Sequence, residues 1–143
     1  MVSRSPVFGE AQLDPVGITV ATKVAMIRNV TLGTLTTEQH LDALIDTGAS
    51  LCIVPPSIAR VLEFHSGNRI RTEKTNIVGG QVEMDVHRLE YLKVGSAKAW
   101  SVMIGVHNTI PNSRYMLVGL SFMSRFRTTF DFKEGRVLFR SRA

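Results

Sequence analysis

The sequence predicts an all-β domain. Short β-prone runs, separated by turn signals, follow one another along most of the 143 residues. The apolar spacing of a helix occurs in only two short segments, 58–62 and 120–126. The length suffices for one domain with a sizeable core, and no internal repeat or low-complexity tract indicates another architecture.

The first 15 residues differ in composition from the rest of the chain. They contain two prolines, a glycine and scattered polar residues. This composition predicts a flexible arm over residues 1–15 with little structure of its own, able to add a strand to a second copy of the chain. The folded domain is then expected over residues 16–143.

The expected strands follow this arm. Val82, Met84 and Val86 alternate with charged and polar residues, which predicts a strand with one exposed face. The pair Gly79-Gly80 just before it predicts a hairpin with a two-residue turn. The expected strands cover residues 18–20, 24–27, 41–45, 51–54, 82–86, 89–94, 99–106, 115–118, 128–132 and 136–139.

The first short helix is expected where two prolines end the strand 51–54. Ser57 is the expected cap of a helix over 58–62, with Pro56 as the alternative occupant of its first turn. Ile58, Val61 and Leu62 would share one apolar face. The polar stretch that follows, 63–76, shows no clear period.

The most informative stretch is Asp46-Thr47-Gly48-Ala49-Ser50. Apolar residues lead into it and follow it, and a carboxylate within an apolar run is costly to bury unless something holds or uses it. Thr47 supplies a hydroxyl that can fix a loop, and Gly48 permits a tight turn. The stretch therefore predicts a carboxylate held rigidly at a strand end, within reach of water, for acid–base chemistry.

The distribution of the basic residues along the chain argues against a nucleic-acid partner. The net charge is +5 and the pI is about 9.9, but the basic residues are spread out rather than gathered in a block. Their densest part, 114–142, has the spacing of a solvated strand face. A basic β-domain that binds nucleic acid stays as a weaker alternative, with steep loss of binding in salt as its signature.

The single cysteine and the composition of the first residues bear on the compartment in which the protein is expected. Cys52 has no partner for an intramolecular disulfide, and its apolar neighbours predict a buried packing residue. Residues 1–14 lack the apolar core of a signal peptide, and no apolar run is long enough to cross a membrane. The expected location is the cytoplasm, or a soluble domain of a larger, membrane-anchored protein, with no membrane contact from this segment.

The histidines do not predict a metal site. All four lie among polar residues, which indicates surface positions. They are His40, His65, His87 and His107. We therefore expect no metal and no cofactor.

Three elements in order resemble the retroviral-type, or retropepsin-like, aspartic proteases, most closely their bacterial and retroelement-like members. Residues 44–50 are similar to the active-site loop of that family, and 77–84 to its flap hairpin. Residues 117–119 resemble its second apolar-apolar-glycine element, which a helix follows. The resemblance covers residues 18–139. It departs from viral members at Leu120, where they carry an arginine that serves the dimer.

The resemblance implies a small closed β-barrel with a flap hairpin and one or two short helices, acting as a dimer. The chain has only one Asp-Thr-Gly, so the implied enzyme is a homodimer in which Asp46 of each subunit shares one proton and activates one water. Thr47 would bond across the two-fold axis, and Gly48 would leave room for the carboxylates. Ala49 stands where pepsin-like relatives carry a hydroxyl, which predicts activity at milder pH.

The implied substrate is a peptide or protein held in extended form. Its backbone would pair with flap and floor. The expected contacts are Ile77, Val78, Gly79 and Gly80 of the flap, with apolar pockets lined by Val54 and Ile104. The alternative is a catalytically silent module of the same fold that binds peptides or proteins without cleaving them.

Overall fold

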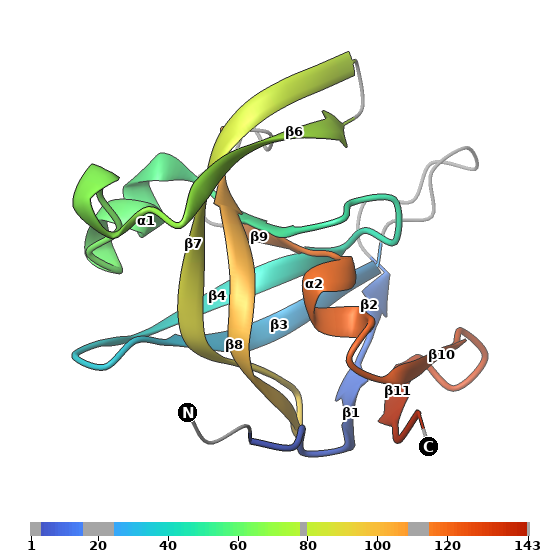
Figure 1. Cartoon of the computed structure of the whole chain (residues 1–143). Helices are drawn as coiled ribbons and strands as arrows, with labels where there is room; N and C mark the ends of the chain where they lie inside the picture. The colour runs from blue at the N-terminus through green and yellow to red at the C-terminus, as the bar shows by residue number, and fades with distance from the viewer. Residues whose placement is uncertain (1–3, 16–24, 78–79, 109–114, 143) are drawn as a thin grey trace.

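The computed structural model describes residues 4–15, 25–77, 80–108 and 115–142 (Figure 1). Within these ranges the chain forms eleven strands, two short α-helices and one 3-10 turn, which confirms the all-β prediction. The strands are β1 Gly9–Gln12, β2 Asp14–Pro15, β3 Ala25–Gly33, β4 Glu38–Ile45, β5 Cys52–Val54, β6 Arg71–Ile77, β7 Gly80–Val94, β8 Ala97–Val106, β9 Tyr115–Val118, β10 Arg127–Asp131 and β11 Arg136–Arg140. The helices are α1 Pro56–Val61 and α2 Leu120–Met123, and the 3-10 turn η1 is Ser66–Asn68.

Six strands close into a barrel. The larger sheet runs in the order β2-β3-β4-β9-β5-β8-β7-β6. An additional antiparallel pairing of β3 with β7 closes the ring β3-β4-β9-β5-β8-β7 and leaves β2 and β6 outside it. At this closure Gly33 pairs with Tyr91. A Cβ at Gly33 would collide with the Tyr91 ring, so the absence of a side chain lets the two strands approach.

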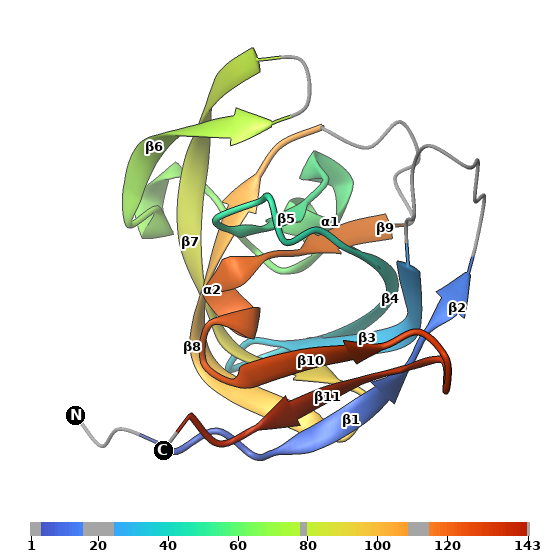
Figure 2. The same ribbon diagram turned by 90° about the vertical axis from the view of Figure 1, so that its right-hand side faces the viewer.

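A second sheet of three strands lies below the barrel. Its order is β1-β11-β10, and Figure 2 shows these strands side by side with α2 above them. Phe122 and Phe126 from the α2 region meet Phe139 of β11, with ring centroids 5.1–5.4 Å apart. All three rings are buried, so this aromatic contact joins the second sheet to the barrel core.

Residues 9–15 differ from the predicted flexible arm. They form β1, which pairs with β11 of the same chain, and β2, which pairs with β3. Ala11 and Leu13 are buried in the main core. Composition misled the prediction, because the two prolines flank this apolar alternation without interrupting it. The strand that was expected to pair with a second copy pairs within its own chain.

The helix α1 begins two residues earlier than predicted. Pro56 occupies its first turn, and Pro55 stands at the cap position without a side-chain hydrogen bond, so Ser57 is not the cap. Leu62 is buried and Ile58 packs against the core, but Val61 is 47% exposed. The apolar face is therefore narrower than its three-residue pattern indicated.

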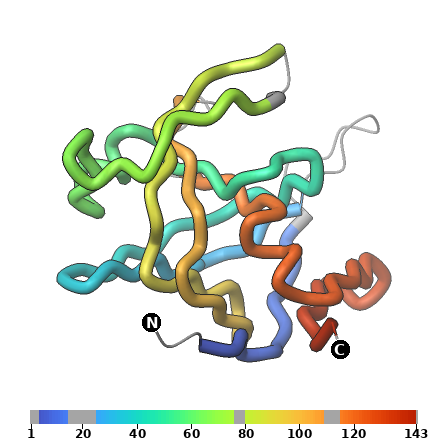
Figure 3. The backbone as a smooth tube through the Cα atoms, in the orientation of Figure 1, coloured from blue at the N-terminus to red at the C-terminus, as the bar shows by residue number. Residues whose placement is uncertain are grey.

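The β6–β7 hairpin projects beyond the barrel (Figure 3). Its register pairs Ile77 with Gly80, so residues 78 and 79 connect the strands and lie outside the described residues. The polar stretch 63–76 gave no sign of β6, since a hairpin with a solvated face needs few apolar residues. β7 is a single strand of 15 residues, longer than the two strands expected there, and it runs from the hairpin into the barrel wall.

The remaining predicted segments are either confirmed or lie outside the described residues. The last hairpin, β10–β11, and the strand–glycine–helix element β9–α2 are confirmed. The expected strand 18–20 and most of the expected loop 107–114 lie outside the described residues. In the part of the chain that is described, no helix is long and apolar enough to cross a membrane.

One histidine is not at the surface. His87 on β7 is 3% exposed, and its ring stacks on Phe64 with centroids 4.6 Å apart. Its Nδ1 has no hydrogen-bond partner among the described residues. Burial lowers the pKa of His87; Asp85 and a hydrogen bond with the Asn68 backbone oppose this shift, and nearby His65 and Arg69 add to it.

We expect His87 to make the fold less stable in mild acid. Its pKa in the folded state lies below the ordinary value of 6.5, so at pH below 6.5 the unfolded chain binds a proton that the native state resists. The free energy of unfolding should fall as the pH falls from 6.5 through the pKa of the folded state. His87→Phe, which keeps the aromatic contact, should flatten this dependence in urea unfolding between pH 7.5 and about 5.

The control is Gln81→Phe, which places the same ring at an exposed position of β7 and removes no titratable group. It should keep the wild-type pH dependence. An unchanged slope in His87→Phe would contradict the assignment.

Candidate active site

The site is built around β9. This strand lies between β4 and β5, and a single loop joins these two neighbours. β9 pairs in parallel with β4 on one side and contacts β5 antiparallel on the other, while residues 46–51 connect β4 to β5. Two backbone hydrogen bonds hold this loop to the end of β9: Asp46 N–H donates to Val118 O at 3.0 Å, and Leu120 N–H donates to Ala49 O at 2.9 Å. The loop therefore follows the end of β9 closely on both sides.

Asp46 is the first residue of this loop and is half-buried. The Gly48 N–H donates to its Oδ1 at 2.9 Å, and the Ala49 N–H donates to its main-chain oxygen at 3.2 Å. A carboxylate that accepts a backbone N–H is fixed in orientation without losing its second oxygen. A Cβ at Gly48 would lie 3.2 Å from Oδ1, a tight contact that glycine avoids.

The sequence-predicted loop residues are therefore brought together. Thr47 and Gly48 form an exposed turn, while Ala49 behind them is buried. The turn presents the Asp46 carboxylate beside two exposed residues and an apolar base. The Asp46 carboxylate thus lies at the end of β4 beside an exposed turn, with one oxygen held by a backbone N–H.

Gly119 fits directly against the loop. A Cβ there would collide with the Leu51 carbonyl and lie 2.6 Å from the Ala49 carbonyl oxygen. Since both obstacles are backbone atoms of the loop, only glycine allows this approach. The second glycine element of the sequence thus supports the first.

Cys52 and Ser121 complete the support. The Ser121 hydroxyl accepts a hydrogen bond from Cys52 N–H and donates one to Met103 O, both at 2.8 Å. Gly119 N–H donates to the Cys52 Sγ at 3.4 Å. Burial raises the pKa of the Cys52 thiol, so it stays neutral and serves packing, as predicted. The role of Ser121 was missed, because a serine in a short helix carries no distinctive sequence signal.

The structure places the two predicted pocket residues in the core. Val54 and Ile104 are both fully buried inside the barrel, so neither can contact a substrate here. β5 alternates its faces: Cys52 and Val54 point into the barrel, whereas Ile53 points the other way. The prediction chose the wrong face, because every residue of this short strand is apolar and its pattern carries no phase.

A second apolar cluster lies on that other face, and we call it the flap-floor cluster. It joins residues of the β4–β5 loop, β5 and β9 to the part of β7 that continues into the hairpin. Its members are Leu51, Ile53, Met84, Val86 and Leu117, with Leu44, Val82 and Met103 packed against them. Figures 1 and 2 show the β6–β7 hairpin above the β4–β5 loop.

The predicted flap residues are only partly described. Gly80 opens β7 with φ +140°, a conformation that favours glycine, and Ile77 ends β6. Val78 and Gly79 lie outside the described residues.

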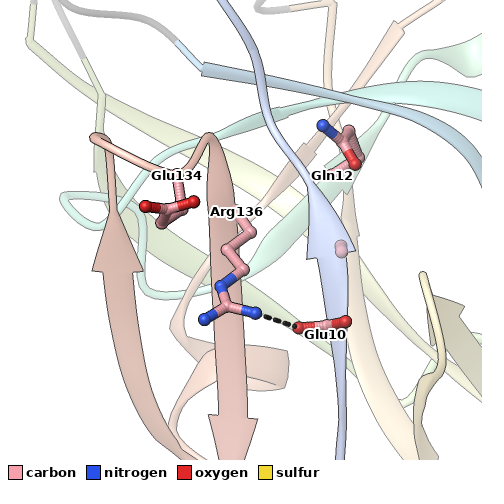
Figure 4. A pocket seen from close by; sticks show the side chains of 5 residues that line it. Glu10, Gln12, Glu134 and Arg136 are labelled. Carbon is pink, nitrogen blue, oxygen red and sulfur yellow. Dashed lines mark hydrogen bonds and ion pairs between the residues drawn. The ribbon is translucent and has the colours of Figure 1, made fainter.

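Other surface features lack the geometry of a reaction centre. Within the described ranges, no three His, Cys, Asp or Glu side chains gather to hold a metal ion. A polar depression between β1 and β11 is lined by Glu10, Ala11, Gln12, Glu134 and Arg136. Figure 4 shows Arg136 bonded to Glu10 at 3.2 Å, so these charges largely satisfy each other.

A closed six-stranded barrel, an Asp-Thr-Gly loop around the end of β9 and a hairpin above this loop define the retropepsin-like aspartic protease fold. The same fold occurs in a solved structure, the retropepsin-like aspartic protease from Rickettsia conorii. The similarity extends over 98% of this chain and 97% of that chain, with a TM-score of 0.62 and 19% sequence identity. No curated protein matches this chain in sequence.

Residues 34–125 match the sequence family described as "gag-polyprotein putative aspartyl protease". The match includes Asp46, the β6–β7 hairpin and Gly119. The chain belongs to this family, and the resemblance found in the sequence is confirmed.

Gly119→Ala should weaken both the fold and the site. The new methyl group would meet two backbone carbonyls that cannot move aside alone, so we expect unfolding to become easier by about 1–3 kcal/mol. Urea unfolding of the purified variant measures this loss.

Ser124→Ala, at an exposed position just after α2, is the control and should stay within about 0.5 kcal/mol of the wild type. Equal stability of Gly119→Ala and the wild type would refute the tight fit.

Proposed function

We propose that the protein is an aspartic endopeptidase that acts as a homodimer. The observation that carries the proposal is the Asp46 carboxylate, oriented by the Gly48 N–H in a loop fixed to β9. Family membership and the shared fold support this assignment. The chain contains one such loop, so a pair of catalytic carboxylates requires two chains.

Two Asp46 carboxyls that meet at a two-fold axis cannot both be ionised at low cost, so they share one proton. The ionised member accepts a proton from water as that water attacks the peptide carbonyl. The protonated member donates to the carbonyl oxygen.

The exposure of Thr47 and Gly48 supports the dimer. Both lie at the tip of the turn beside Asp46, where a second copy can approach. Leu120, where viral members carry arginine, is 42% exposed just after Gly119, and it offers an apolar contact in place of an ion pair. In the proposed dimer, Thr47 bonds across the axis.

The flap-floor cluster supports an extended peptide as substrate. It lies between the hairpin and the loop that carries Asp46, with half-buried Leu44, Val82 and Met103 at its margin. A peptide that pairs with the hairpin would direct alternate side chains toward this margin. We therefore expect a preference for apolar side chains beside the cleaved bond.

Asp46→Asn should abolish cleavage of a mixed peptide library. Loss of the ionisable group removes the base and the shared proton, so we expect kcat to fall by at least about 100-fold. The control is Asp131→Asn in the distant β10–β11 hairpin, which should keep wild-type activity. Mass spectrometry of the products measures both.

Equal cleavage by wild type and Asp46→Asn would sink the protease proposal. Peptide binding without cleavage by the wild type would favour the silent binding module instead. A strictly monomeric species in sedimentation under active conditions would exclude the shared pair.

Ala49 gives a separate expectation about pH. Its buried methyl group places no hydroxyl beside the carboxyl pair to favour the charged form. The dimer should therefore work at milder pH than pepsin-like enzymes. A pH–rate profile tests this, and an optimum near about pH 2 would contradict it.

A further inference from the structure

The hairpin is joined to the active-site loop by one pair of hydroxyls. The Oγ of Ser50 lies 2.9 Å from the Oγ1 of Thr75, although the residues are 25 positions apart in the sequence. Ser50 belongs to the loop that begins at Asp46, and Thr75 lies on β6. The bond therefore connects the segment that carries the carboxylate to the segment that covers it.

Thr75 is buried on a strand whose neighbouring side chains, from Arg71 to Lys74, are exposed or half-buried. It is 7% exposed, whereas Thr72 and Lys74 on the same strand are exposed. A buried hydroxyl without a partner is costly, and the Thr75 hydroxyl avoids this cost by its hydrogen bond with Ser50. The buried Thr75 hydroxyl therefore favours the hairpin position in which it can bond to Ser50 of the loop.

The pair adjoins the flap-floor cluster from both sides. Thr75 pairs across the hairpin with Val82, which packs against the cluster, and Ser50 precedes Leu51, a member of it. Apolar contacts are not directional, so they hold the hairpin near the floor without fixing where it sits. A hydrogen bond between two short side chains does fix that position.

We propose that the Ser50–Thr75 pair is a latch that sets the height of the hairpin above the loop of its own subunit. Both are positioning residues: they shape the space that a peptide enters and do not touch the reacting atoms. The latch holds the hairpin at its third residue pair from the turn, Thr75 with Val82. This inference rests on the proposed function for its catalytic consequence, but its structural part is independent of cleavage.

The first test is hydrogen exchange, which needs no activity. Thr75→Val keeps the shape of the side chain and removes the hydroxyl. A lost neutral hydrogen bond corresponds to faster exchange of amides 80–86 by about two-fold to ten-fold. Amides 99–104 of β8 in the barrel should be unchanged. Ser50→Ala should have the same effect, and the double variant should be no worse than either single one.

Two variants serve as controls. Thr75→Ser retains a hydroxyl and should restore the wild-type exchange pattern. Thr72→Val makes the same chemical change at an exposed position of the same strand and should have no effect. Faster exchange throughout the barrel would mean a general loss of stability and would overturn the latch, as would strictly additive single effects or unchanged exchange in both single variants.

The second test is kinetic. With a peptide that the wild type cleaves, Thr75→Val should raise KM by about two-fold to ten-fold with little change in kcat, because the latch positions the binding surface and leaves Asp46 untouched. Thr75→Ser should restore KM. An equal fall of kcat at constant KM would contradict a positioning role.

Exchange measurements in the Asp46→Asn background separate the two proposals. The same exchange pattern without any cleavage by the wild type would retain the latch and reject the protease. Cleavage by the wild type with no change in exchange or KM on loss of the hydroxyls would retain the protease and reject the latch.

Discussion

The attachment of the Asp46 loop to the end of β9 is the constraint on which the rest of the structure depends. The loop has to change direction around a strand end, so its backbone groups must find partners there. Val118 O and Leu120 N–H supply them, one on each side of Gly119. Because Gly119 has no side chain, the carbonyls of Ala49 and Leu51 approach closely, and β4 and β5 can flank β9 in the same barrel.

This arrangement also resolves the conflict posed by a carboxylate within an apolar run. The residues before and after Asp46 enter the barrel wall, whereas the turn at Thr47 and Gly48 stays exposed. The carboxylate is thus carried to the surface by the same turn whose N–H group orients it. Rigidity comes from the buried part of the loop, including the Cys52–Ser121 contact, and accessibility comes from its tip.

The sequence predicted those features that carry a strong local signal. Asp46 and Gly119 stand out because each breaks an apolar run, and their chemistry leaves few alternatives. Three features lacked such a signal. β5 is apolar on both faces, so Val54 was assigned to a substrate pocket although it lies in the barrel core. His87 occupies a polar position in the alternating pattern of β7, but Phe64 from another segment covers its ring. β1 looked irregular by composition and gains its order from pairing with β11 at the other end of the chain.

One physical reason explains why some features were predicted from the sequence and others were missed. Local sequence encodes what a residue can do, whereas the face it turns toward is decided by partners far along the chain. The Ser50–Thr75 pair belongs to the second kind. Neither residue is unusual in its own segment, and their significance arises only when the barrel places β6 over the loop.

A division of labour follows for the proposed enzyme. One chain builds its own barrel and joins its own hairpin to its own loop through Ser50 and Thr75. The proposed mechanism then needs a second carboxylate from another copy. A second copy then adds chemistry more than structure, and the fraction of active protein would depend on chain concentration by mass action. The position of the flap and the formation of the carboxyl pair are thus separate steps, one set within the chain and the other between chains.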